Sequence, residues 1–203
     1  MIDNFIKNFH LTFGNNSNEM PWIVTENLSK TIKDLISKLN SDYKIENEIA
    51  IHKTAIVENP STLKGPIIIS ENCFIASFTY LRGPIFIGKS VTIGPGSEIK
   101  QSIIGNNSNT AHFNFIGNSV IGSNVNFEAG AVIANHYNER VNKEIFVILQ
   151  NKMINTQVVK FGAIVGDGCK IGANAVLSPG TILERNTVVD RMQVIKQTKD
   201  MEL

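Results

Sequence analysis

Aliphatic side chains recur at every sixth position along most of this chain. One unbroken series comprises Ile51, Val57, Leu63, Ile69, Ile75, Leu81, Ile87, Ile93 and Ile99, and the spacing continues after two one-residue shifts. An α-helix repeats near 3.6 residues and an isolated strand every two, so a period of six indicates short strands joined by tight turns. Three hexads would complete one triangular coil of about 18 residues. We therefore predict an all-β fold, a left-handed parallel β-helix of hexapeptide repeats.

Small residues and glycines accompany the aliphatic series. A small or branched residue lies two positions before many of its members, and glycine often follows directly, as in Ile87-Gly88. Small side chains fit a crowded corner, and glycine or asparagine tolerates the positive φ that tight turns often require. Cys73 and Cys169 occupy two of the small-residue positions. We expect both to be small buried thiols, because two distant cysteines form no disulfide framework.

Residues 1–48 lack the six-residue period and form a separate N-terminal segment. From Pro21 onward, apolar residues such as Leu28 and Ile32 have helical spacing, with lysines between them. We predict an amphipathic helix that packs on one end of the β-helix as a cap, since solenoids need covered ends. Residues 1–19 carry no comparable pattern.

Residues 49–203 form the predicted β-helix domain, which an excursion interrupts at about residues 134–158. Two β-prone runs in the excursion flank the polar pair Asn151-Lys152, a pattern that predicts a hairpin. Long excursions from a regular scaffold often carry function. The hairpin is therefore one place to look for a site.

Inward positions are explained by packing, so the polar residues between them are more informative. Arg82 and Lys100 lie three hexads apart, which would place them on adjacent coils of one face. Two stacked cations make a good site for an anion, most simply a phosphate, although both could also be solvated surface charges. Glu98 is predicted to point outward on the same coil as Lys100.

His112, Asn126 and Asn135 are also predicted to point outward. His112 follows the first one-residue shift, and we expect the shift to deform the coil there, much as a β-bulge re-aims a side chain. A histidine at that place could be a general base or an ordinary surface residue, and asparagine is common at turns. Zinc binding is a competing hypothesis, but the four histidines lack close ligand spacing. We expect no metal.

Composition and charge argue against several classes of function. The formal net charge is +1 over 203 residues, which produces no strong field toward nucleic acid or an anionic membrane. No apolar run reaches transmembrane length, and the first residues show no signal-peptide pattern. P-loop and GxSxG motifs are absent. We expect a cytoplasmic protein with neither a nucleic-acid nor a membrane partner.

The span from Tyr80 to Arg140 resembles the C-terminal acetyltransferase domain of bifunctional N-acetylglucosamine-1-phosphate uridyltransferases. The similar features are, in order, Leu81-Arg82, Glu98-Ile99-Lys100, Ala111-His112-Phe113-Asn114-Phe115-Ile116-Gly117, Asn126, Ala129-Gly130 and Asn135. The hairpin and the segment that follows it look closer to archaeal-type sugar-phosphate members. The resemblance extends over about residues 21–190 and implies a hexapeptide-repeat acyltransferase.

In that family an acetyl group passes from acetyl-CoA to the amine of glucosamine 1-phosphate. The resemblance implies that His112 is the general base and that Asn135 orients the reacting groups. We predict that the remaining substrate contacts come from Arg82, Glu98, Lys100, Phe115, Asn126 and Lys143. Backbone at Ala129 and Ala163 would contact the acetyl-CoA, and no metal would be required. Because the family site lies between subunits, the resemblance also implies a homotrimer.

Three positions depart from that family. Phe115 replaces a tyrosine, Glu128 replaces a glycine beside the expected thioester, and Lys143 is only an approximate match to a lysine beyond Asn135. The 203 residues also contain no uridyltransferase half, so the acceptor could be an amino-sugar phosphate or a nucleotide-linked amino sugar, and a separate nucleotidyltransferase could be a partner. An acyl carrier protein could replace CoA as donor. The departures keep open a second hypothesis, a non-catalytic trimeric β-helix that binds a sugar nucleotide or a protein.

Overall fold

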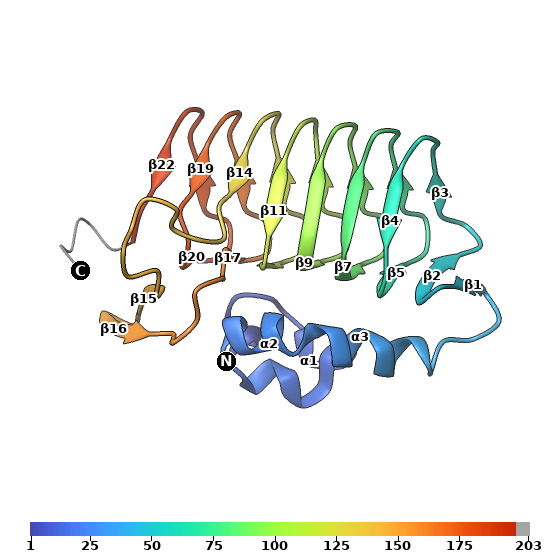
Figure 1. Cartoon of the computed structure of the whole chain (residues 1–203), viewed down its shortest axis with the longest axis horizontal. Helices are drawn as coiled ribbons and strands as arrows, with labels where there is room; N and C mark the ends of the chain where they lie inside the picture. Colours follow the sequence, from blue (N-terminus) through green and yellow to red (C-terminus); the bar gives the residue numbers. More distant parts are fainter. Residues whose placement is uncertain (198–203) are drawn as a thin grey trace.

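The computed structural model describes residues 1–197 and shows a β-helix of about eight turns. Helices from the N-terminal segment lie beside the coils, and a small antiparallel hairpin projects from them (Figure 1). Consecutive coils pair through parallel strands in register, as with Ile67, Ile85 and their neighbours. The predicted parallel β-helix of hexapeptide repeats, with its helical N-terminal segment and inserted hairpin, is confirmed.

Three flat faces run along the stack of coils. The N-terminal helices pack on one of them, which we call the covered face, and we call the other two the open face and the third face. The covered face consists of β2 (Ile49–His52), β5 (Ile67–Ile69), the second halves of β7 (Tyr80–Ile87) and β9 (Glu98–Ile104), β12 (Val120–Ile121), β17 (Ala163–Val165) and β20 (Thr181–Leu183). The open face consists of β4 (Thr62–Lys64), the first halves of β7 and β9, β11 (Phe115–Gly117), β14 (Val132–Ile133), β19 (Val176–Leu177) and β22 (Val194–Ile195). The third face consists of β3 (Ile56–Val57), β6 (Phe74–Ile75), β8 (Thr92–Ile93), β10 (Asn109–Thr110), β13 (Asn126–Phe127), β18 (Lys170–Ile171) and β21 (Val188–Val189).

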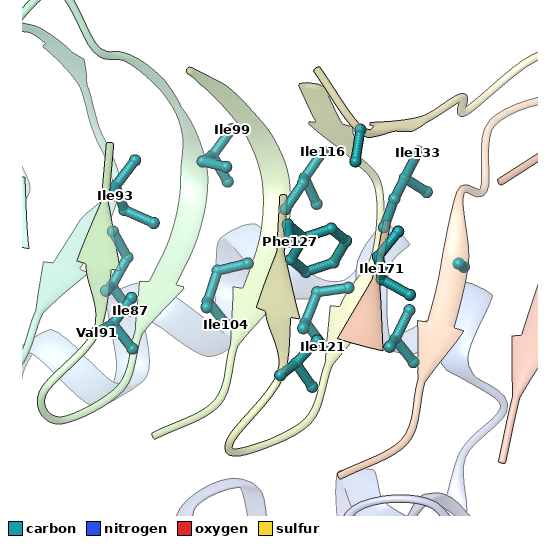
Figure 2. Packing of buried hydrophobic residues seen from close by; sticks show 14 of the residues in the cluster. Ile87, Val91, Ile93, Ile99, Ile104, Ile116, Ile121, Phe127, Ile133 and Ile171 are labelled. Carbon is teal, nitrogen blue, oxygen red and sulfur yellow. The ribbon is translucent and has the colours of Figure 1, made fainter. Parts of the chain in front are cut away.

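Aliphatic side chains from all three faces fill the interior of the prism. Ile87, Ile93 and Ile99 of successive strands are fully buried and stack on their equivalents one coil along (Figure 2). Cys73 and Cys169 lie in this core as free thiols, as predicted. The Cys73 thiol donates a hydrogen bond to the Gly88 carbonyl oxygen, and burial raises its pKa to about 11. Both thiols are therefore packing groups.

The one-residue shifts fall at the corner between the open and covered faces. Gln101 and Asn118 occupy this corner with φ of 46° and 47°, and each of their coils is one residue shorter than the coil that begins with β7. The corner of His112, between the third and open faces, keeps the full spacing. The expectation that a shift deforms the coil at His112 is therefore wrong. The shifts instead shape the corner that receives Asn135 and the N-terminal helices.

The N-terminal helices lie along the covered face and not on one end of the β-helix, which corrects the predicted cap (Figure 1). The segment contains η1 (Ile2–Asn4), α1 (Phe9–Phe13), η2 (Gly14–Asn18), α2 (Pro21–Glu26) and α3 (Leu28–Ile36). The single helix expected from Pro21 is thus broken at Asn27, and residues 1–19 contribute helical turns of their own. The coil stack begins instead with β1 (Tyr43–Glu46), which pairs antiparallel with β2.

Outward side chains of the covered face explain this position. Ile68, Ile103, Val120 and Ile164 point out of the prism on different coils of this face, yet each is at most 2% exposed. They pack against helical residues that include Ile2, Phe5, Phe9, Leu28 and Ile32. Burying apolar surface stabilises by roughly 25 cal/mol per Å². The helical layer therefore completes a second core outside the prism.

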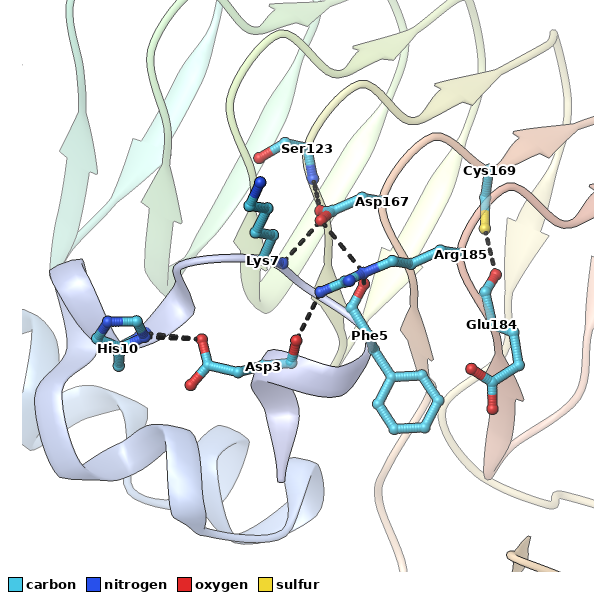
Figure 3. Close-up of polar contacts among 9 residues, drawn as sticks. All are labelled: Asp3, Phe5, Lys7, His10, Ser123, Asp167, Cys169, Glu184 and Arg185. Carbon is cyan, nitrogen blue, oxygen red and sulfur yellow. Dashed lines mark hydrogen bonds and ion pairs between the residues drawn. The ribbon is translucent and has the colours of Figure 1, made fainter.

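Two charged residues fasten the start of the chain to the coils (Figure 3). Asp167 accepts hydrogen bonds from the N–H groups of Lys7 and Ser123, at 2.7 and 2.8 Å. Arg185 of the next coil donates to the carbonyl oxygens of Phe5 and Asp3. Because these bonds engage backbone groups, they fix the path of residues 3–7 along the covered face.

The predicted hairpin is present between β14 and β17. Its strands β15 (Phe146–Leu149) and β16 (Lys152–Asn155) pair antiparallel around Gln150-Asn151, one residue earlier than the predicted turn. A third apolar cluster joins its base to the helices, and in it the Trp22 and Phe161 rings meet edge to face at 5.8 Å. The hairpin and α2 therefore support each other.

Candidate active site

Arg82, Glu98 and Lys100 come together on the open face, as predicted. Arg82 of β7 is the register partner of Lys100 of β9, so the two cations occupy adjacent coils. The Arg82 guanidinium donates to Glu98 Oε1 from Nε at 2.8 Å and also from Nη2. The carboxylate thereby fixes the position of the guanidinium. This arrangement orients one cation and leaves Lys100 beside it.

A third cation, Lys160, follows the hairpin in the sequence and lies close enough to Lys100 for its charge to act on it. Burial lowers the pKa of Lys100, and the nearby charges of Lys160 and Arg82 lower it further, while Glu98 opposes the shift. Crowded cations of this kind are stabilised by a bound anion. Sequence reasoning missed Lys160 because its proximity depends on the path of the excursion. Lys143, the predicted contact, is exposed within the excursion.

Asn135 lies directly beyond the cations on the same face. An added Cβ on Gly117, the register partner of Lys100, would meet the Asn135 side chain at 2.9 Å and the Phe115 ring at 3.0 Å. The Asn135 amide is buried and donates to Asn118 Oδ1 at 2.6 Å. Glycine at position 117 therefore leaves room for Asn135 and Phe115 to close one end of the cationic patch.

His112 lies in the exposed turn between β10 and β11. Its carbonyl oxygen accepts a hydrogen bond from the Gly130 N–H of the next coil at 2.9 Å. Asn114, inside the same corner, donates to the carbonyl oxygens of Glu128 and Ala131. These bonds fix the turn to its neighbour. The His112 imidazole is thus exposed on a rigid backbone.

Glu128, one coil beyond His112, and Arg191, three coils beyond it, form an ion pair along the same corner. Arg191 donates to both Glu128 oxygens at 2.7 and 2.8 Å, and the Ala173 N–H donates to Oε2. These contacts lower the pKa of Glu128 to about 2. A groove of roughly 530 Å³ starts here and extends over the third face along Asn126 and Lys170. The carboxylate is held at the groove wall.

The predicted site residues therefore fall into two groups within one chain. Arg82, Glu98, Lys100, Phe115 and Asn135 share the open face, whereas His112, Asn126 and Ala129 lie at the next corner and on the third face. Ala163 is buried at the start of β17, by the corner of Asn118.

Within residues 1–197, no three or more His, Cys, Asp or Glu side chains gather in a way that could hold a metal ion. In the same part of the chain, no helix has the length and apolarity needed to span a bilayer.

Comparison with known families defines the class of protein. The family model described as "GMPPB C-terminal domain" matches residues 45–155, which is more than half of the chain. The chain belongs to this family. It is a hexapeptide-repeat acyltransferase region homologous to the C-terminal domain of the bifunctional GlmU proteins and to archaeal sugar-1-phosphate nucleotidylyltransferase/acetyltransferases.

Individual relatives support the assignment. "Bifunctional protein GlmU" of Wigglesworthia glossinidia brevipalpis is 31% identical over 135 residues, which are 64% of this chain and 28% of the relative. A "bifunctional sugar-1-phosphate nucleotidylyltransferase/acetyltransferase" of Sulfurisphaera tokodaii is 33% identical over 157 residues, 68% of this chain and 38% of the relative. The chain spans less than two fifths of the length of these curated relatives.

One solved structure also gives a partial match. The structure of an Arabidopsis UDP-N-acetylglucosamine acyltransferase matches 76% of this chain and 62% of its own, with 14% identity and a TM-score of 0.42. The family assignment rests on the family model and the sequence relatives.

Proposed function

We propose that this protein is an acyl-CoA-dependent N-acyltransferase, with acetyl-CoA as donor and an amino-sugar phosphate or a nucleotide-linked amino sugar as acceptor. The observation that supports it most is the cluster of Arg82, Lys100 and Lys160 beside Asn135 on one face, together with an exposed His112 at another corner of the prism. Cations suit a sugar-linked phosphate, and an exposed imidazole suits removal of an amine proton.

The chemistry divides between the two groups of residues. The phosphate of the acceptor binds the open-face cations, and Asn135 and Asn126 orient the sugar. His112 accepts a proton as the amine nitrogen attacks the thioester carbonyl, and the resulting imidazolium returns it to the departing CoA sulfur. An amide bond forms and the thioester bond breaks. The groove beside Ala129 takes the pantetheine arm, with Glu128 drawn aside by Arg191.

A homotrimer would bring the two groups together. The corner of His112 carries exposed Phe113 and Phe78, at 72% and 70% exposure, which suits contact with a second copy. In this arrangement the open face of one protomer meets the corner of its neighbour, and each site draws on both. Sedimentation equilibrium tests it: the expected mass is about three times 22.4 kDa, and a monomer would contradict it.

Release of free thiol from acetyl-CoA tests the proposed reaction. We expect turnover with at least one acceptor from a panel of amino-sugar phosphates and nucleotide-linked amino sugars. His112→Ala should lower kcat by about 10²–10⁴-fold, the usual contribution of a general base. His10→Ala, which alters an exposed histidine of the N-terminal segment, is the matched control and should retain full activity.

Two results would contradict the proposal. A His112→Ala protein with full activity would remove the assigned base. The second is a lack of turnover with every acceptor of the panel, together with no thermal shift on addition of acetyl-CoA. This result would favour the alternative of a non-catalytic β-helix that binds a sugar nucleotide or a protein.

A further inference from the structure

A row of cations on the open face continues beyond Arg82 and Lys100. Lys64 of β4 is the register partner of Arg82, which is itself the partner of Lys100. We call Lys64, Arg82 and Lys100 the cation ladder. Neighbouring strands lie about 4.8 Å apart, so the ladder extends over about 10 Å along the β-helix. One phosphate group is much shorter than this distance.

Lys64 and Arg82, the first two members of the cation ladder, both lie near the aromatic ring of Tyr80. Lys64 Nζ lies 5.1 Å and Arg82 Cζ 5.4 Å from the ring centroid. Each cation–π contact at an exposed site is worth only about 0.5–1 kcal/mol, and the two like charges repel each other. An anion between Lys64 and Arg82 would remove that repulsion. This place is separate from Lys160, which acts on Lys100.

The two ends of the ladder differ in what they adjoin. Lys100 adjoins Gly117 and, through it, Asn135, where the proposed function places the acceptor sugar. Lys64 lies at the opposite end, two coils from Lys100 and three coils from Gly117. A sugar monophosphate would reach the Lys100 end, and the Lys64 end would be left without a ligand.

Resting on the proposed function, we propose that the acceptor carries a diphosphate, as in a nucleoside diphosphate-linked amino sugar. The phosphate next to the sugar binds Lys100 and Lys160, and the outer phosphate binds Lys64 and Arg82. With Glu98 included, these side chains comprise four cations and one carboxylate, a balance that suits a diphosphate better than a single phosphate. Lys64 is then a specificity residue.

Calorimetric binding of simple anions tests the ladder without acyl transfer. We expect pyrophosphate and UDP to bind the intact protein at least about tenfold more tightly than orthophosphate and UMP, the size of one added charge-assisted contact. Lys64→Ala should abolish this preference, and Lys64→Arg should retain it. Lys44→Ala removes an exposed lysine of β1 and is the matched control. Equal affinities in the intact protein, or a preference that survives Lys64→Ala, would overturn the inference.

Thiol release separates this inference from the proposed function. Lys64→Ala should raise KM about tenfold for a nucleotide-linked amino sugar and leave KM for the corresponding sugar 1-phosphate unchanged. Turnover with sugar 1-phosphates alone would contradict the proposed diphosphate acceptor and would still support the proposed acyltransferase function. Lys64-dependent binding of pyrophosphate without turnover on any acceptor would support the cation ladder as a diphosphate site and contradict the proposed acyltransferase function.

Discussion

The covered and open faces share two strands, β7 and β9, yet their outward residues differ in kind. On the second halves of these strands the outward positions are Phe86 and Ile103, which pack under the N-terminal helices. On the first halves the outward positions are Arg82, Glu98 and Lys100, which carry the cationic patch. The inward residues of both halves are alike, since Leu81, Ile87, Ile99 and Ile104 all enter the core.

The difference shows that the hexad determines the prism and the outward residues determine each face. Apolar outward residues recruit a helical layer, whereas charged ones stay accessible to a ligand. The layer also reaches the patch, because the Gln101 amide, next to Lys100, donates to the Thr25 carbonyl oxygen at 3.0 Å. Stability of the covered face and geometry of the open face are therefore connected at one corner.

The largest expected effect comes from placing a charge under the helical layer. Ile164→Asp should cost about 3–5 kcal/mol of unfolding free energy, because an unpaired carboxylate would be buried between β17 and the helices. Val194→Asp, at an outward position of the open face that is 55% exposed, is the control and should change stability by less than about 0.5 kcal/mol. Urea denaturation measures both. Similar losses in the two variants would remove the distinction between the faces.

A smaller effect of opposite sign is expected on the open face. The pKa of Lys100 is lowered in the folded state, so its protonated form destabilises the folded protein at pH values below that folded pKa. The destabilisation decreases as the pH rises from the folded pKa toward the ordinary value of 10.5. Lys100→Met should therefore raise unfolding free energy at pH 7, by at most about 1 kcal/mol at this partly exposed site, and weaken phosphate binding. Thermal unfolding at pH 7 and 10 checks this. A destabilised variant at pH 7 would contradict it.

The smallest effect should be confined to the corner beyond His112. The pKa of Glu128 is about 2 against an ordinary 4.5, so its contribution to stability is present above pH 4.5 and is lost as pH falls through about 2. Arg191→Ala should move the Glu128 titration midpoint upward, as followed by carboxyl ¹³C NMR. Lys170→Ala, which removes a cation from the same groove, should leave it in place. An unchanged midpoint in Arg191→Ala would show that the Ala173 N–H alone holds the carboxylate.

The sequence predicted the prism because inward residues obey a local rule. Ile69, Ile75 and Leu81 are fully buried where the period placed them, and the excursion forms its hairpin within one residue of the predicted turn. The stacking of Arg82 on Lys100 followed from the same rule. These features depend only on coil length and alternation, which sequence spacing records directly.

The helical layer escaped prediction because it depends on outward residues. The pairs Ile103-Ile104, Val120-Ile121 and Ile164-Val165 each place an aliphatic residue outward beside an inward one, and this doubling was the available signal of a covered face. Residues 1–19 are too short a segment for periodicity to show. Lys160 is 60 residues from Lys100, and only the return path of the excursion brings them together.

The antiparallel strand β1 has a consequence for how these molecules behave toward one another. Every coil offers the next a row of parallel backbone groups, so a bare first coil would be a template on which a second molecule could continue the stack into a fibre. β1 occupies this edge on the covered face, where it pairs with β2 in the opposite direction, and it exposes Lys44 and Glu46 on its outer side. On that face, β1 blocks growth by addition of another β-helix.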